Sequence, residues 1–203
     1  MYVDLSHVLG ENTPVYPGDV MTKLDRYKEL DRDGYQAFLL YTGLHTGTHI
    51  DLPQHFFDDP RDFLDFPVNN FIARGVLLDV RNKNIISMRE EYRHLIKARD
   101  AVLLFTGHDI YYHEDRYFQN YPVIDEELAC FFIESQVSIL GMDTPAPDYV
   151  PFTLHKQLLE HNIFLLENMT NLSDLLGKQF ELISFPLKLQ AEASPVRAVA
   201  RLL

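Results

Sequence analysis

The chain has 203 residues, 46% hydrophobic and 24% charged, a composition that suits a folded domain with a substantial core and not a disordered segment. Its formal net charge of -12, with no run of Lys or Arg, makes nucleic acid and anionic membranes poor candidate partners. The single cysteine, Cys130, excludes an internal disulfide, and no segment approaches the roughly 18 apolar residues of a membrane span. Since the first residues contain no apolar run of signal-peptide length, we expect a cytoplasmic protein.

The first forty residues predict short elements separated by a loop. Residues 1–5 predict a strand, and the turn-forming residues 10–19 predict a loop. Residues 22–32 are highly charged and predict an exposed segment, followed by a strand at 36–42. That strand and the segment after it are expected to form either a hairpin or one bent strand around Gly43.

The rest of the chain alternates between apolar runs and helical spacing. Continuous apolar runs predict buried strands, and a repeat of three to four residues predicts helices. The expected strands are 73–80, 101–106, 137–143, 163–167, 180–189 and 198–203, and the expected helices are 87–98, 125–134, 153–161 and 171–176. This pattern predicts one α/β domain over residues 1–203, with a central mixed β-sheet or barrel-like core flanked by helices. Periodicity does not show whether neighbouring strands run parallel or antiparallel, or whether the sheet closes into a barrel.

The segment from His45 to His55 contains the candidate metal-binding and catalytic side chains. It places His49, Asp51 and His55 at +4, +6 and +10 from His45, and even spacing puts side chains on one face of an extended strand. We therefore predict a strand carrying His45, His49 and Asp51. Pro53 is expected to break it into a loop that returns His55 to the same site.

Imidazole and carboxylate donors in this arrangement favour a transition metal over isolated structural roles. A single histidine is commonly a hydrogen-bonded core or surface group, but burying several imidazoles with a carboxylate and no cation would be costly. Three ligands, His45, His49 and Asp51, would leave a coordination position open for water, which is the catalytic arrangement. His55 is then either a general base and acid beside the metal or a fourth ligand.

Other polar and aromatic residues each suit two roles. The phenylalanines of residues 56–67 suit either an apolar pocket beside the metal or ordinary packing. His108 and His113 have no donor at useful spacing, so we expect them to line a pocket or face solvent. Residues 111–117 predict a surface segment.

The pattern His45-x-Gly-Thr-His49-x-Asp51-x-Pro53-x-His55 resembles the signature of the cyclase family of metal-dependent hydrolases. The similarity extends along the chain, to residues 4–7, 16–19, 103–107, 141–143 and 194–200. This resemblance implies a swivelling β/β/α fold and a homodimer or homotetramer with the pocket near a subunit boundary. It also implies hydrolysis of a carbonyl–nitrogen bond, in an aryl formamide such as N-formylkynurenine or in a lactam such as isatin.

The resemblance further implies a second metal site. His155 and Glu167 are twelve residues apart, as in the family, so the second metal would take Asp51, His155 and Glu167. His55 resembles the histidine that moves protons. Zinc would suit a formamidase and manganese an isatin hydrolase, since His/Asp/Glu sites accept both.

Two departures from the family concern the substrate. The chain has no Trp, so Phe and Tyr would have to form an aryl pocket. Residues 190–193, Gln-Ala-Glu-Ala, stand where many members have a turn containing Gly and Asp. The alternatives to an aryl formamidase are therefore a hydrolase of a cyclic amide or lactone, and a metal- or ligand-binding protein without catalysis.

Overall fold

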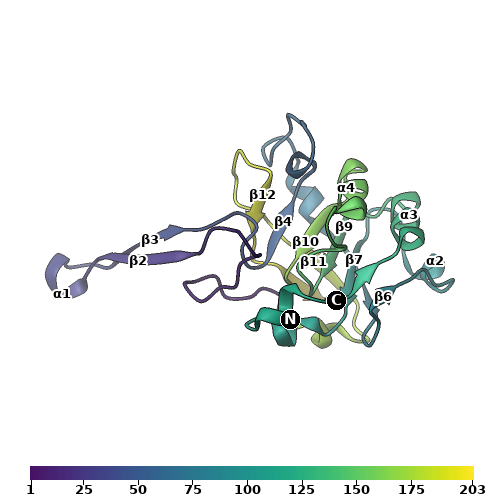
Figure 1. The fold of residues 1–203 in the computed structure, drawn as a ribbon, viewed down its shortest axis with the longest axis horizontal. Coiled ribbons are helices and arrows are strands. Elements are labelled where there is room, and N and C mark those ends of the chain that lie inside the picture. Colours follow the sequence, from purple (N-terminus) through teal and green to yellow (C-terminus); the bar gives the residue numbers. More distant parts are fainter.

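The computed structural model describes all 203 residues, which are organised around one curled sheet of nine strands (Figure 1). The central strands pair in parallel, and antiparallel strands extend the sheet on both sides. Across the sheet the order is β1 (Tyr2–Asp4), β13 (Val199–Leu202), β11 (Phe180–Ile183), β5 (Ile72–Asp79), β7 (Ala101–Phe105), β9 (Ile139–Met142), β10 (Phe164–Glu167), β4 (His49–Asp51) and β12 (Ala193–Pro195). The predicted α/β class with a mixed, barrel-like sheet is confirmed.

Helices and two small two-stranded sheets surround this sheet. The small sheets pair β2 (Lys23–Lys28) with β3 (Ala37–Tyr41), and β6 (Ile85–Ile86) with β8 (Val123–Ile124). The α-helices are α1 (Leu30–Asp33), α2 (Tyr92–Leu95), α3 (Glu126–Glu134) and α4 (Thr153–Glu160). Short 3-10 helices cover Pro53–His55, Val68–Phe71, His108–Tyr111, Asp115–Phe118 and Leu172–Leu175. No helix has both the length and the apolar character to cross a membrane.

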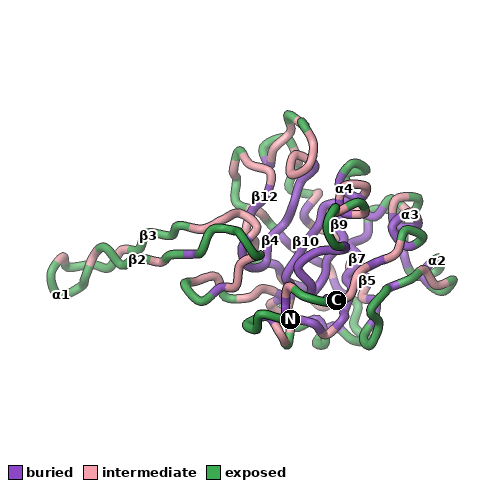
Figure 2. The backbone as a smooth tube through the Cα atoms, in the orientation of Figure 1, coloured by how far each residue is buried: buried purple, intermediate pink, exposed green.

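The central strands are buried on both faces, which explains their continuous apolar sequence. Every residue of β7 is buried, and Figure 2 shows the sheet as the buried centre of the molecule. On one face, Leu104 belongs to an apolar cluster with Phe132 of α3 and Leu158 of α4. On the other face, Leu103 belongs to a cluster with Leu182 of β11. Helices therefore cover one side, and the curled edge of the sheet closes the other.

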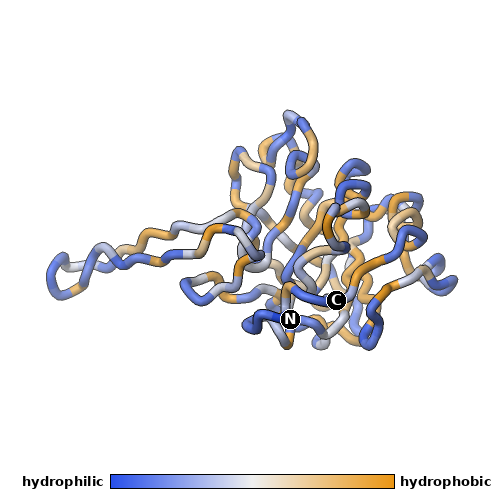
Figure 3. The backbone as a smooth tube through the Cα atoms, in the orientation of Figure 1, coloured by the Kyte–Doolittle hydropathy of each residue, from blue (hydrophilic) through white to orange (hydrophobic).

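The strands β2 and β3 form a hairpin arm that extends away from this body, with α1 at its tip (Figure 1). We refer to residues 20–42 as the arm. Phe38 and Leu40 point to one face of the ribbon and Leu39 and Tyr41 to the other, because side chains alternate along a strand. All four are exposed, and Figure 3 shows an apolar stretch along β3 beside the mainly hydrophilic β2. No residue of the arm belongs to either apolar cluster of the body.

One prediction about the first half of the chain is confirmed and another is wrong. Residues 22–32 are largely exposed, as expected, and Lys23–Lys28 among them form β2, in which Leu24 pairs with Leu40 across the hairpin. The strand at 36–42 therefore pairs backwards with β2. It forms neither a hairpin nor a bent strand with the histidine segment around Gly43.

The predicted helix at 87–98 is also wrong in extent, because only Tyr92–Leu95 is helical. The chain leaves the helix at Ile96, and Arg99 adopts a positive φ of 67°. The Arg99 N–H donates to the Gln136 carbonyl at 2.8 Å, which ties this turn to the end of α3. Tertiary hydrogen bonding overrides the apolar spacing here.

The strand predicted at 180–189 ends at Ile183, where Ser184 N–H turns to donate to the Phe71 carbonyl at 2.9 Å. The segment at 111–117 is not a surface segment throughout, because Tyr112 and Tyr117 are buried. The helix at 125–134 is confirmed as α3: Asp125 caps it by accepting a hydrogen bond from Leu128 N–H at 2.9 Å.

Candidate metal centre

Two paired strands and one helix bring together four of the predicted ligands. His49 and Asp51 are two residues apart on β4 and so share a face. Antiparallel pairing places Glu167, the last residue of β10, directly opposite His49. His155 reaches the same place from the first turns of α4, where it is buried.

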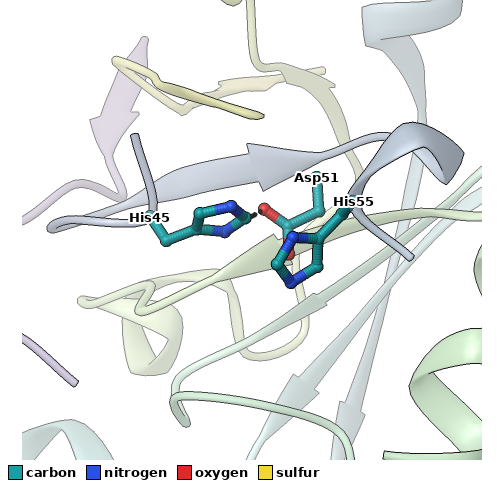
Figure 4. A group of neighbouring side chains, drawn as sticks. All are labelled: His45, Asp51 and His55. Atoms are coloured by element: carbon teal, nitrogen blue, oxygen red, sulfur yellow. Dashed lines mark ion pairs between the residues drawn. The ribbon is translucent and has the colours of Figure 1, made fainter. Parts of the chain in front are cut away.

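His45 lies close to these residues, but not on the predicted strand. It occupies a turn before β4, because Gly47 adopts a positive φ of 70° and interrupts the extended backbone. The even-spacing argument therefore fails for His45. The turn nevertheless brings its Nδ1 to 2.9 Å from Asp51 Oδ1 (Figure 4).

His55 returns to the site by the predicted route. Pro53 begins a single 3-10 turn that ends at His55. The His55 ring centroid lies 4.1 Å from that of His45 and 5.8 Å from that of His155. Figure 4 shows its imidazole beside the Asp51 carboxylate, with His45 on the other side.

The donor atoms form two overlapping groups that share Asp51. One consists of His45, Asp51 and His55, and the other of His49, Asp51 and Glu167; within each group the donor atoms lie within 4.8 Å of one another. His49 Nε2 is 3.4 Å from Asp51 Oδ1 and 3.4 Å from Glu167 Oε2. His155 Nε2 is 3.4 Å from Asp51 Oδ2, and its Nδ1 is 3.8 Å from Glu167 Oε1.

This grouping differs from the assignment that the family resemblance implies for His49, His55 and His155, and His155 belongs to neither of the two groups. The resemblance places His49 with His45 and Asp51, and His155 with Asp51 and Glu167. In the structure, His49 Nε2 lies between Asp51 and Glu167, and the His55 ring approaches the His45 side. Both ways of dividing the donors use the Asp51 carboxylate as the shared group.

The hydrogen bonding of these side chains fits a bound cation. The atoms that are buried, make no hydrogen bond and face one another here include His49 Nε2, both Asp51 oxygens, both His155 ring nitrogens and Glu167 Oε1. A buried polar atom without a partner costs about 1–3 kcal/mol, and more when it is charged. Such a concentration of unpaired donors in one place is expected only where something else satisfies them, and imidazole and carboxylate suit a divalent transition metal.

The two neighbouring imidazoles, His45 and His55, have opposite pKa shifts. Burial lowers the pKa of His45, but the charge and hydrogen bond of Asp51 outweigh it and raise the pKa to about 11. Burial lowers the pKa of His55 to about 4, and Asp51 only partly opposes this. His55 is therefore neutral at neutral pH and able to accept a proton.

Backbone groups fix which nitrogen of His49 faces the site. Its Nδ1 lies 2.9 Å from the Gly47 carbonyl, so Nδ1 carries the proton and Nε2 is free as a ligand. The Asn168 amide donates to the same carbonyl at 3.0 Å, and Tyr117 OH donates to Asn168 Oδ1 at 2.8 Å. Sequence reasoning missed these supporting roles, and the only signal was the position of Asn168 directly after Glu167.

A cavity of about 270 Å³ opens beside the donors. Its aromatic wall consists of Tyr16, Phe56, Phe118 and Phe152, so Phe and Tyr do form the pocket of this Trp-free chain. Of the phenylalanines at 56–67, Phe56 lines the cavity, whereas Phe63 and Phe66 pack in the core.

The two other singled-out histidines lie apart from the donors. His108 is buried, and its Nε2 is 2.8 Å from the Tyr117 carbonyl. His113 is exposed. Neither lines the cavity beside the metal donors.

Comparison with known proteins agrees with this fold. Residues 3–149 match the family model named Cyclase. A kynurenine formamidase from Bacillus cereus is 31% identical over 206 residues, covering 98% of this chain and 97% of that protein. A kynurenine formamidase from Bacillus mycoides is 30% identical with the same coverage.

The solved structures with the same fold include two isatin hydrolases. Isatin hydrolase A from Ralstonia solanacearum superposes with a TM-score of 0.87 at 24% identity, covering 98% of this chain and 91% of that one. An isatin hydrolase bound to the product analogue thioisatinate gives a TM-score of 0.86 at 25% identity, covering 100% and 92%.

The fold, the donor cluster and the match over residues 3–149 together define a protein class, and the chain belongs to the cyclase family. Its similarity to the Bacillus formamidases extends over nearly the whole of both chains. The chain is accordingly a hydrolytic enzyme of that family.

Proposed function

We propose that this enzyme hydrolyses the C–N bond of a small aryl formamide, with N-formylkynurenine as the leading substrate, and that the whole chain acts as one catalytic domain. The observation that carries the proposal is the cluster of buried, unpaired His, Asp and Glu donors beside an aromatic cavity. The choice of a formamide rests on the identity of 31% to the formamidase of Bacillus cereus.

The donors would hold one or two divalent cations. His45, His49 and Asp51 would hold the first, and Asp51, His155 and Glu167 the second, with zinc as the proposed metal and manganese as the alternative. A cation there would supply electrophilic activation of the carbonyl and a lower pKa for an attacking water.

His55 is the proposed proton carrier. Its ring borders Asp51 and the cavity without being held by a hydrogen bond, and its lowered pKa leaves both forms of the reaction cycle open to it by keeping the free ring unprotonated at neutral pH. It would accept the proton of the attacking water at a ring nitrogen. It would then donate that proton to the leaving aryl amine as the C–N bond breaks, so that the products are formate and the amine.

The aromatic wall would bind the aryl ring. Phe56 and Phe152 each lie against His155, with ring centroids 4.9 and 5.9 Å away, so a ring packed on them would place its formamide at the donors. Flat apolar surfaces of this kind also exclude water from the reacting carbonyl.

The test is hydrolysis of three compounds by metal-loaded and chelator-treated protein: N-formylkynurenine, formanilide and isatin. The proposal expects turnover of the formamides, loss of activity on chelation, and recovery when zinc or manganese is returned. Chelated protein that turns over a formamide at the untreated rate would contradict it. Tight metal binding without turnover of any of the three would favour a binding protein instead.

A specific feature of the cavity favours a second candidate, a lactam hydrolase acting on an uncharged ring such as isatin. The residues lining the cavity include Asp19 but no Lys or Arg. The carboxylate of an amino-acid substrate would find no cationic side chain on this wall, whereas isatin needs none. Faster turnover of isatin than of both formamides would replace the first proposal by the second.

We also propose that the enzyme is a homo-oligomer, a homodimer or homotetramer, assembled through the arm. Leu39 is 59% exposed and Tyr41 57% exposed, on a two-stranded ribbon that is marginally stable by itself. The charges near the tip are paired within the arm: Arg26 with Glu29 at 3.2 Å and Lys28 with Asp33 at 3.1 Å. Apolar surface therefore remains to be covered, and a second copy of the chain is the proposed partner.

A further inference from the structure

Glu192 lies beside His45 on the side opposite Asp51. His45 Nδ1 is 2.9 Å from Asp51 Oδ1, whereas His45 Nε2 is 3.4 Å from Glu192 Oε1. The imidazole therefore stands between two carboxylates, one among the metal donors and one outside them. Glu192 belongs to residues 190–193, the segment that departs from the family pattern.

Strand pairing holds Glu192 in this place. It directly precedes β12, which pairs antiparallel with β4, and Ala193 is opposite Asp51. The Glu192 carbonyl accepts a hydrogen bond from Leu52 N–H at 2.9 Å. The backbone of Glu192 is thus fixed against the strand that carries the donors, and its side chain is only 35% exposed.

His49 and His45 differ in how the ring nitrogen away from the donor cluster is supported. His49 has a backbone acceptor, the Gly47 carbonyl, which its position on β4 supplies. His45 sits in a turn and has no backbone acceptor. Glu192 is the acceptor within reach of its Nε2. A histidine ligand commonly donates its second N–H to a carboxylate, which fixes the ring and strengthens it as a donor.

We propose that Glu192 is a positioning residue that accepts the Nε2–H of His45 and so holds Nδ1 towards the cation site. This inference rests on the metal site of the proposed function and extends it to a residue outside the donor set. Its consequence is that metal affinity depends on a side chain held next to β12, 137 residues or more from the histidine segment along the chain. Loss of such a support lowers metal affinity by about 10–100-fold.

The experiment measures the zinc dissociation constant by chelator competition, on metal-stripped protein, for wild type, Glu192→Ala and Glu192→Gln. Glu192→Ala is expected to weaken zinc binding about 10–100-fold. Glu192→Gln is expected to fall between it and wild type, because the amide oxygen still accepts a hydrogen bond but carries no charge. Glu160→Gln is the matched control, since Glu160 is exposed at the end of α4 and should leave the constant unchanged.

A zinc constant within twofold of wild type in Glu192→Ala would overturn the inference while leaving the metal site intact. The same result with a raised KM would instead identify Glu192 as a contact for a cationic part of the substrate. Wild-type protein that binds no zinc would contradict the metal site itself, and the inference with it. Circular dichroism of each variant confirms that the fold is retained.

Discussion

The metal centre and the arm are both incomplete in one chain, for opposite reasons. At the centre, polar atoms of His49, Asp51 and Glu167 are buried without partners. On the arm, apolar side chains such as Leu39 are exposed without partners. The first imbalance is relieved by a cation and the second by another protein surface. Buried polar atoms without hydrogen-bond partners thus indicate a bound ion. Exposed apolar side chains without packing partners indicate a protein interface.

The largest expected effect follows from removing the carboxylate that both donor groups share. Asp51→Asn should lower formamide hydrolysis by at least about a thousandfold, because the neutral amide cannot neutralise the cations that the reaction requires. Steady-state rates on the metal-loaded protein measure this. If Asp51→Asn kept a tenth of the wild-type rate, the donor cluster would not be the reaction centre.

The variant His55→Ala distinguishes a role in proton transfer from a role as a metal ligand. The rate should fall about 10²–10⁴-fold while the bound metal is kept, since His55 is proposed to move a proton and not to complete the coordination. Metal analysis of the same preparation supplies the second readout. Loss of metal together with activity would make His55 a ligand, in accord with its place beside His45 and Asp51.

The arm is tested by placing charge on the face that carries Leu39 and Tyr41. The double variant Leu39→Lys and Tyr41→Lys should shift the protein to monomers, with an association constant at least about 100-fold weaker, because two charges would have to be desolvated in the interface. Val68→Lys is the control, an exposed apolar residue outside the arm. Light scattering after size-exclusion chromatography gives the mass. An unchanged mass would remove the arm from the interface.

The body of these arm variants should keep its stability, because no arm side chain belongs to either apolar cluster. Denaturant unfolding at a concentration where wild type and variant are both monomeric provides the measurement. A large loss of unfolding free energy would mean that the arm packs on its own body.

A smaller effect concerns His7, which stacks on Tyr112 with ring centroids 3.5 Å apart. Burial, with a contribution from His113, lowers the pKa of His7 to about 4. The folded state then binds fewer protons than the unfolded state between pH 4 and 6.5, so this contribution to stability is present above pH 6.5 and lost on acidification. His7→Gln should reduce the acid loss by up to about 3 kcal/mol, since each pKa unit between 6.5 and 4 is worth about 1.4 kcal/mol. Identical pH profiles would contradict this.

The sequence predicts the strands of the body well because they are continuous apolar runs. Residues 101–106 and 163–167 correspond to β7 and β10, which are buried on both faces. The return of His55 after Pro53 also followed from local rules, since proline ends the strand and begins the turn. These features depend on neighbours in the chain, which the sequence displays directly.

The remaining features depend on contacts between distant residues. No periodicity places Glu192 beside His45, because that contact comes from pairing of β12 with β4. The convergence of His155 and Glu167 on Asp51 was implied only by family resemblance. The sequence does not indicate the arm. The charged residues of β2 do not have the pattern of a strand, and the apolar residues of β3 have the pattern of an ordinary buried strand.

The most direct test of the central claim is the metal content per chain of enzyme purified without added metal, compared with Asp51→Asn prepared in the same way. We expect one or two divalent ions per wild-type chain, zinc or manganese, and their loss in the variant. Wild-type protein that is active on a formamide yet free of divalent metal would contradict it, as would full retention of metal by Asp51→Asn.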